Sequence, residues 1–158
     1  MITWAVNRNA VDSILADDID ALLDPDPGQW VVTCGFRSQA QQAIEWQKGR
    51  DDEGFVVDRA AVVTDAKPGE SPHNFGRAVD VTLIVDGHDV WAYQSSPDWQ
   101  RLFAAVKAHP RLHSGINLVL SSGSKRIPGS PNGKLPHSPI GTPCASSRHT
   151  TNPLSLSL

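Results

Sequence analysis

The chain has 158 residues, of which 39% are hydrophobic, and this length and composition predict one domain with a single core. Two cysteines exclude a disulfide framework, and no apolar run approaches the ~20 residues that a membrane-spanning helix needs. The net charge of −3 hides an asymmetry, because all seventeen Asp and Glu residues lie at or before Asp98, so any carboxylate ligand or general base must come from that part.

The first third of the chain predicts one helix and one strand. Apolar residues recur at helical spacing over residues 11–23, with Asn9 available as the N-cap, and the Pro-rich segment 24–28 ends the pattern. Residues 30–34 form a short β-rich run that ends before Gly35, which predicts a strand. Cys34 at its end is expected to be a free thiol that packs as a small buried hydrophobe.

The middle of the chain predicts two more helices and three strands. Ser38 can cap a helix through Gln47 or Lys48, and residues 60–64 favour a strand. Residues 78–85 are the strongest strand pattern, and Asp86-Gly87 predicts a tight hairpin that returns through 89–91. Ser96-Pro97 opens a third helix.

These elements predict an α+β fold, with a small antiparallel sheet flanked by three helices. Residues 1–117 form the expected domain. Residues 118–158 form an atypical tail, because positions 121–158 hold nine Ser, six Pro and four Gly. This tail is interpreted as disordered or as out-of-frame sequence, and the gene sequence would decide between the two. There is no internal repeat or second domain, and we expect a monomer.

The segment 71–80 carries the chemistry. On a two-residue period Asp80 shares one face of its predicted strand with Thr82, whereas Val79 and Val81 share the other. A carboxylate buried there without a partner would cost several kcal/mol. A divalent metal shared with His73 would supply the partner, because zinc accepts both imidazole nitrogen and carboxylate oxygen. The alternative is an edge-strand Asp facing water beside an unrelated loop histidine.

Two blocks of residues resemble a known family. Residues 63–80, and upstream Gly35-Phe36-Arg37-Ser38 with Gln42 and Gly49-Arg50, occur in the expected order and separation. Over residues 30–107 the chain resembles the VanY-like D,D-carboxypeptidases and the related phage L-alanyl-D-glutamate endopeptidases. The resemblance implies a Hedgehog/D,D-peptidase-like fold and a zinc site.

The resemblance also implies roles for individual residues. His73 and Asp80 would be the first two zinc ligands, and Arg37 would hold the substrate carbonyl or the developing oxyanion. Gln42 and Ser71 would line the substrate site. The residues themselves leave simpler alternatives open: Arg37 as a solvated cation at a strand end, Gln42 facing solvent on its helix, and Ser71 capping a turn.

The third ligand and the base are where this sequence departs from the family. The family places its third ligand in a C-terminal Pro-His context, and the nearest match here makes His137 the candidate. His113 is a rival, and a site with no third protein ligand is the other alternative. The position of the family's general base falls on Lys134, and a lysine cannot serve as that carboxylate.

The resemblance implies a zinc-dependent peptidoglycan peptidase of the endolysin type, acting on the stem peptide between L-alanine and D-glutamate. Alternatives are a D-alanyl-D-alanine carboxypeptidase, or a catalytically inactive relative that binds zinc or wall peptide. The basic tail lacks a nucleic-acid-binding motif, so no nucleic-acid partner is expected. Without a signal peptide or apolar span, we expect a protein that is cytoplasmic when made, does not insert into membranes, and acts on the wall after release.

Overall fold

The computed structural model describes residues 2–90, 95–115 and 154–158. Its centre is a six-stranded sheet in the order β1-β2-β3-β6-β5, with β4 pairing to β3. The strands are β1 Ile2–Trp4, β2 Gln29–Cys34, β3 Ala78–Val85, β4 His88–Val90, β5 His113–Ser114 and β6 Leu154–Ser157. The α+β class is confirmed, although the sheet is mixed because β1 runs parallel to β2.

The three predicted helices are present as α1 Ser13–Leu23, α2 Gln39–Gln47 and α3 Pro97–Ala108. Helix α1 begins later than the apolar pattern suggested, because Asp12 rather than Asn9 is its N-cap and accepts hydrogen bonds from the backbone N–H groups of Ile14 and Leu15. Ser38 caps α2 in a capping box with Gln41, as its position predicted.

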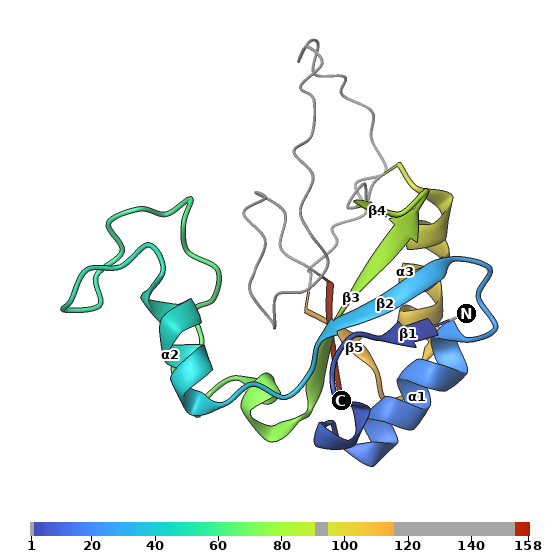
Figure 1. The fold of residues 1–158 in the computed structure, drawn as a ribbon, viewed down its shortest axis with the longest axis horizontal. Helices are drawn as coiled ribbons and strands as arrows, with labels where there is room; N and C mark the ends of the chain where they lie inside the picture. The colour runs from blue at the N-terminus through green and yellow to red at the C-terminus, as the bar shows by residue number, and fades with distance from the viewer. Residues whose placement is uncertain (1, 91–94, 116–153) are drawn as a thin grey trace, which may run out of the picture.

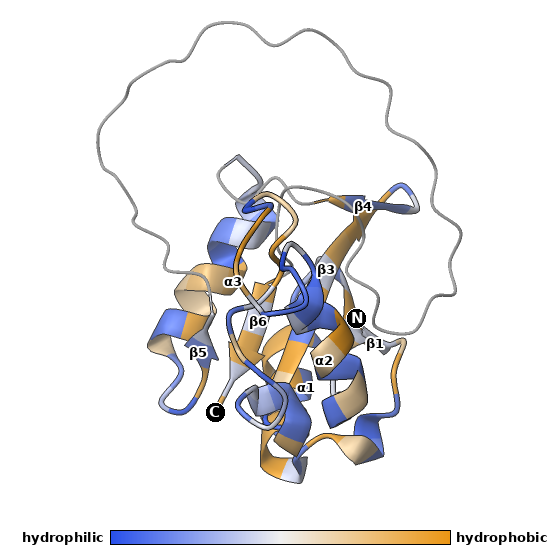
Figure 2. Cartoon of the chain, turned by 90° about the vertical axis from the view of Figure 1, so that its left-hand side faces the viewer, coloured by the Kyte–Doolittle hydropathy of each residue, from blue (hydrophilic) through white to orange (hydrophobic). Residues whose placement is uncertain are grey.

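The core lies between one face of the sheet and the helices α1 and α3, whereas α2 stands in a separate lobe (Figure 1). In Figure 2 hydrophobic residues colour the strands, and the helices alternate between hydrophobic and hydrophilic bands. The expectation that all three helices pack around the sheet is therefore correct only for α1 and α3. The lobe that contains α2 is joined to the sheet near the start of β3 (Figure 1).

The strand predicted at residues 60–64 is wrong. These residues form turns and irregular backbone within the loop that follows α2. Arg50 holds this loop with its side chain, which donates to the carbonyl oxygens of Trp46 and Thr64 and lies over the Trp46 ring. Hydrogen bonds from the Arg50 side chain thus take the place of the backbone hydrogen bonds that a strand would have made. The β-branched residues of the segment favoured a strand and did not indicate this contact.

The end of the chain belongs to the core. Strand β6 pairs with β3 on one side and β5 on the other, and Leu154 and Leu156 are fully buried. Burial of a leucine side chain stabilises a fold by about 1.5–3 kcal/mol, so these two residues tie the C-terminus to the domain. The boundary at 117 and the character of the tail stay predictions, because residues 116–153 lie outside the described residues.

None of the helices in the described parts of the chain combines the length and the hydrophobicity that crossing a bilayer requires.

A buried carboxylate links α1 to the segment after α3. The Arg111 guanidinium donates two hydrogen bonds to Asp18, one of them at 2.8 Å from Nε to Oδ2, and His109 Nε2 lies 3.9 Å from Oδ1. The hydrogen bonds from Arg111 hold the pKa of Asp18 below its usual value, despite the opposing effect of burial. The ion pair therefore joins α1 to the segment that follows α3.

We expect the stabilisation from Asp18 to disappear in acid. A carboxyl whose folded pKa is lowered stabilises the fold above its unfolded pKa of about 3.9, and this contribution is lost as the pH falls through the folded pKa. Denaturant unfolding of the wild type and Asp18→Asn should therefore differ most near neutral pH and converge below about pH 4. Curves that stay equally far apart at every pH would contradict this assignment.

Candidate metal centre

His73 is held in a short 3-10 helix, Pro72–Phe75, between the α2 lobe and β3. The Ser71 hydroxyl caps this turn by accepting from the His73 backbone N–H. Gly76 ends it in the left-handed conformation with φ 65°, where a Cβ atom would lie 2.7 Å from the Ala10 carbonyl oxygen. The turn therefore needs glycine at this position and points the chain directly into the strand that carries Asp80.

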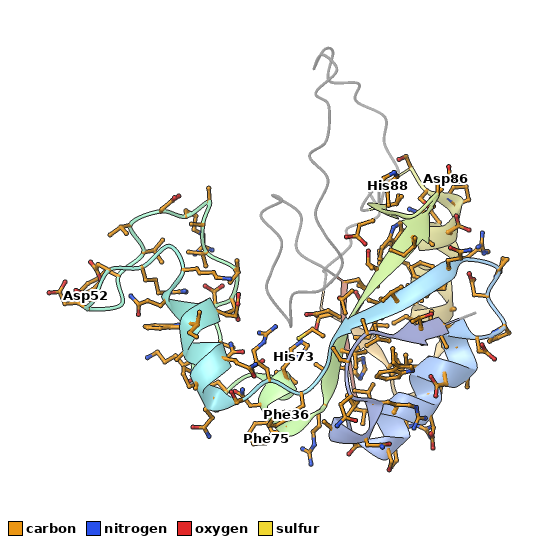
Figure 3. The ribbon with its side chains drawn as sticks, viewed as in Figure 1. Phe36, Asp52, His73, Phe75, Asp86 and His88 are labelled. Atoms are coloured by element: carbon orange, nitrogen blue, oxygen red, sulfur yellow. The ribbon has the colours of Figure 1, made fainter. Side chains whose placement is uncertain are left out.

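The orientation of the His73 ring is fixed by its backbone partner. Nδ1 lies 2.8 Å from the Gly35 carbonyl oxygen, so Nδ1 carries the proton and donates it there. Nε2 consequently has its lone pair available and lies 3.4 Å from Asp80 Oδ1. Histidine ligands of metals are commonly oriented by such a carbonyl on the other ring nitrogen. Figure 3 shows His73 where the α2 lobe meets the sheet.

Asp80 lies inside the sheet rather than at its edge. Strand β3 is flanked by β2 and β6, and Asp80 is only 6% exposed, which excludes the alternative of a carboxylate facing water. Its two oxygens have different neighbours: Oδ1 faces His73 Nε2, and Oδ2 lies 3.8 Å from Arg37 Nη2. Thr82 shares this face of β3 and is 1% exposed, and its hydroxyl has no hydrogen-bond partner among the described residues.

Arg37 joins the α2 lobe to the site. Its Nη1 donates to Gln42 Oε1 at 2.9 Å, and Gln42 Nε2 donates to the Ala66 carbonyl oxygen at 2.8 Å. Gln42 is fully buried, so the alternative that it only faces solvent on its helix is excluded. The Arg37 side chain is only 12% exposed and likewise differs from a solvated cation at a strand end. This chain of hydrogen bonds fixes a positive charge beside Asp80.

Cys34 completes the cluster of groups that lie close enough to share an ion. Cys34, His73 and Asp80 are all buried and offer ligand atoms within 4.8 Å of one another. The expectation of a free thiol at Cys34 is wrong, because its sulfur is disulfide-bonded, and Cys144, the other cysteine of the sequence, lies outside the described residues. A disulfide sulfur is no thiolate and is a poor metal ligand. The strong ligands of this cluster are therefore His73 and Asp80.

The structure thus brings together five of the six predicted site residues: Arg37, Gln42, Ser71, His73 and Asp80. The sixth, His137, lies outside the described residues, as does Lys134. His113 is exposed in β5 and is not part of the cluster. Sequence reasoning missed Ser155, whose hydroxyl lies 3.2 Å from His73 Nε2. The Leu-Ser-Leu-Ser alternation of a half-buried strand was the signal that could have revealed it.

The donor set fits a divalent metal. An imidazole nitrogen with an available lone pair and a carboxylate oxygen face each other in a buried site, and both are ordinary zinc ligands. Among the described residues, the positive charge that lies beside this buried carboxylate is that of Arg37. His73 and Asp80 are therefore the residues that would hold a divalent cation here.

Comparison with known proteins supports the resemblance seen in the sequence. No protein-family model matches the chain. Over 62 residues the chain is 40% identical to the peptidoglycan L-alanyl-D-glutamate endopeptidase CwlK of Bacillus subtilis (strain 168). This match covers 39% of the chain and 34% of that protein, so the chain spans about a third of the relative's length. This match confirms the resemblance to this group of cell-wall peptidases over those 62 residues.

Proposed function

We propose that the chain is a zinc-dependent peptidase that hydrolyses an amide bond in the stem peptide of bacterial peptidoglycan. The observation that carries this proposal is the buried pair His73–Asp80 with Arg37 on its far side, in a chain that resembles an L-alanyl-D-glutamate endopeptidase. By the same resemblance, the bond between L-alanine and D-glutamate is the proposed site of cleavage. The proposed partner is the stem peptide alone, bound by a monomer.

The residues divide the work as follows. His73 and Asp80 would hold the metal, which would supply Lewis-acid activation of the amide carbonyl and of the attacking water. Gly35 keeps His73 in the tautomer that offers Nε2. Arg37 is positioned by Gln42 to place positive charge near the reacting carbonyl, where negative charge develops in an amide hydrolysis. Ser71 acts on the site by shaping the turn that presents His73.

The lack of an identified general base among the described residues favours a second function. Apart from Asp80, no carboxylate belongs to the cluster around His73 in the described parts of the chain, and the family's base position is occupied by Lys134. Hydrolysis needs a group that accepts the proton of the attacking water. A relative that binds zinc and wall peptide without cleaving is therefore the second candidate.

We expect the purified chain to bind one zinc ion and to cleave peptidoglycan in a chelator-sensitive manner. Metal content is measured by mass spectrometry of the desalted protein, and cleavage by new amino groups on defined muropeptides. A new N-terminus on D-glutamate identifies the proposed bond, whereas release of D-alanine identifies a carboxypeptidase. Zinc binding without any product would favour the second function, and absence of both zinc and product would overturn both.

A further inference from the structure

Leucine and serine alternate along strand β6, and the two residue types face opposite sides of the sheet. Leu154 and Leu156 are fully buried in the core, whereas Ser155 and Ser157 are half-buried. This two-residue alternation places the serines on the sheet face opposite the core, the face to which Asp80 also points. The last strand of the chain thus contributes side chains to the face that carries the metal centre.

The register of β6 places Ser155 directly at the centre. Ser155 is the cross-strand partner of Asp80, and its Oγ lies 3.2 Å from His73 Nε2. Because Nδ1 of that ring donates to Gly35, the Ser155 hydroxyl is the donor and Nε2 the acceptor. Its backbone is held on the other side too, since Gly115 N donates to the Ser155 carbonyl oxygen at 2.7 Å. Ser155 therefore contacts the nitrogen lone pair that a metal would use.

We propose that position 155 is the third protein position of the metal centre and that serine there makes the centre a weak one. The inference rests on the proposed metal site, because it assigns a residue to that site. A neutral hydroxyl is a poor zinc ligand beside imidazole, thiolate or carboxylate. Its hydrogen bond to Nε2 also competes with the metal for the same lone pair. The identity of residue 155 thus sets the affinity of the site.

The other possible third groups are less suited to this position. The Cys34 sulfur lies 3.9 Å from Nδ1, the ring nitrogen already bound to Gly35, and it is held in a disulfide. His113 is exposed and faces Ser157 in the register of β5 and β6. Gly115 approaches Ser155 closely, because a Cβ atom at this glycine would lie in tight contact, 3.2 Å, with Ser155 Cβ.

The test is the zinc affinity of variants at position 155, measured by competition with a chromophoric chelator. Ser155→His adds an imidazole beside His73 and Asp80, and we expect zinc to bind tighter by on the order of 10-fold or more. Ser155→Asp is smaller, adds a carboxylate, and is expected to shift affinity in the same direction. Cobalt absorption spectra should show an additional nitrogen ligand in Ser155→His. Thermal unfolding confirms that each variant is folded.

Matched controls separate this inference from the proposed function. Ser157→Ala alters the neighbouring serine of the same strand face and should leave zinc affinity unchanged. The double variant Ser155→His with His73→Ala should lose the gain. If His73→Ala abolishes wild-type binding but neither Ser155→His nor Ser155→Asp binds tighter, the inference is overturned and the metal site stands. A loss of about tenfold or more in His137→Ala would also overturn it.

Discussion

His73→Ala is expected to abolish zinc binding and, with it, any cleavage of peptidoglycan. His73 supplies the one imidazole nitrogen of the cluster, and Asp80 alone would retain a single carboxylate oxygen that Arg37 already neutralises in part. Loss of one of two strong ligands should weaken zinc binding by about 100-fold or more. Metal content after dialysis and a chelator-competition titration measure the first effect, and product formation from defined muropeptides measures the second.

The matched control is His88→Ala. His88 lies in β4 at the far end of the β3–β4 hairpin from His73, as Figure 3 shows, and its side chain is exposed. This variant removes an imidazole without touching the site, so zinc content and cleavage should match the wild type. Asp80→Asn refines the test, because it keeps the size of the side chain and removes the charge that balances Arg37. Full zinc binding in His73→Ala would refute the proposed centre.

Trp99→Ala is expected to cause the largest loss of stability among substitutions away from the site. Trp99 is fully buried on α3, packs edge-on against Trp30 with ring centroids 4.9 Å apart, and stacks with Phe103 at 5.8 Å. Its Nε1 donates to the Val90 carbonyl oxygen at 2.8 Å. Truncation of a buried tryptophan leaves a cavity and costs about 3–5 kcal/mol. It also removes the donor that Nε1 provides to Val90.

Denaturant unfolding followed by circular dichroism measures this change in the free energy of unfolding. The control is Phe55→Ala, which also removes an aromatic ring, but one that is 70% exposed in the α2 lobe. We expect this variant to change stability by less than about 0.5 kcal/mol. Equal losses for Trp99→Ala and Phe55→Ala would mean that the core does not depend on the packing of α3 against β2.

Local sequence signals predicted much of the fold because the relevant interactions are local. Ser38 and Ser96 cap their helices through hydrogen bonds to residues three positions away, and Asp86-Gly87 closes a hairpin between neighbouring strands. The segment 60–64 misled the prediction because its β-branched composition carries no information about Arg50, whose side chain holds that loop. In this segment the tertiary contact with Arg50 outweighs the strand propensity of the β-branched residues.

The sequence alone also determined the chemistry of the candidate site, since His73 and Asp80 are joined by a short turn and a strand whose geometry follows from Gly76 and the two-residue period. The tertiary structure decided what surrounds them. Arg37 reaches Asp80 through the packing of the α2 lobe. Ser155 is 82 residues from His73 in the sequence and contacts it because β6 pairs with β3. Contacts at such a distance depend on strand pairing and register, which a local pattern of residues does not encode.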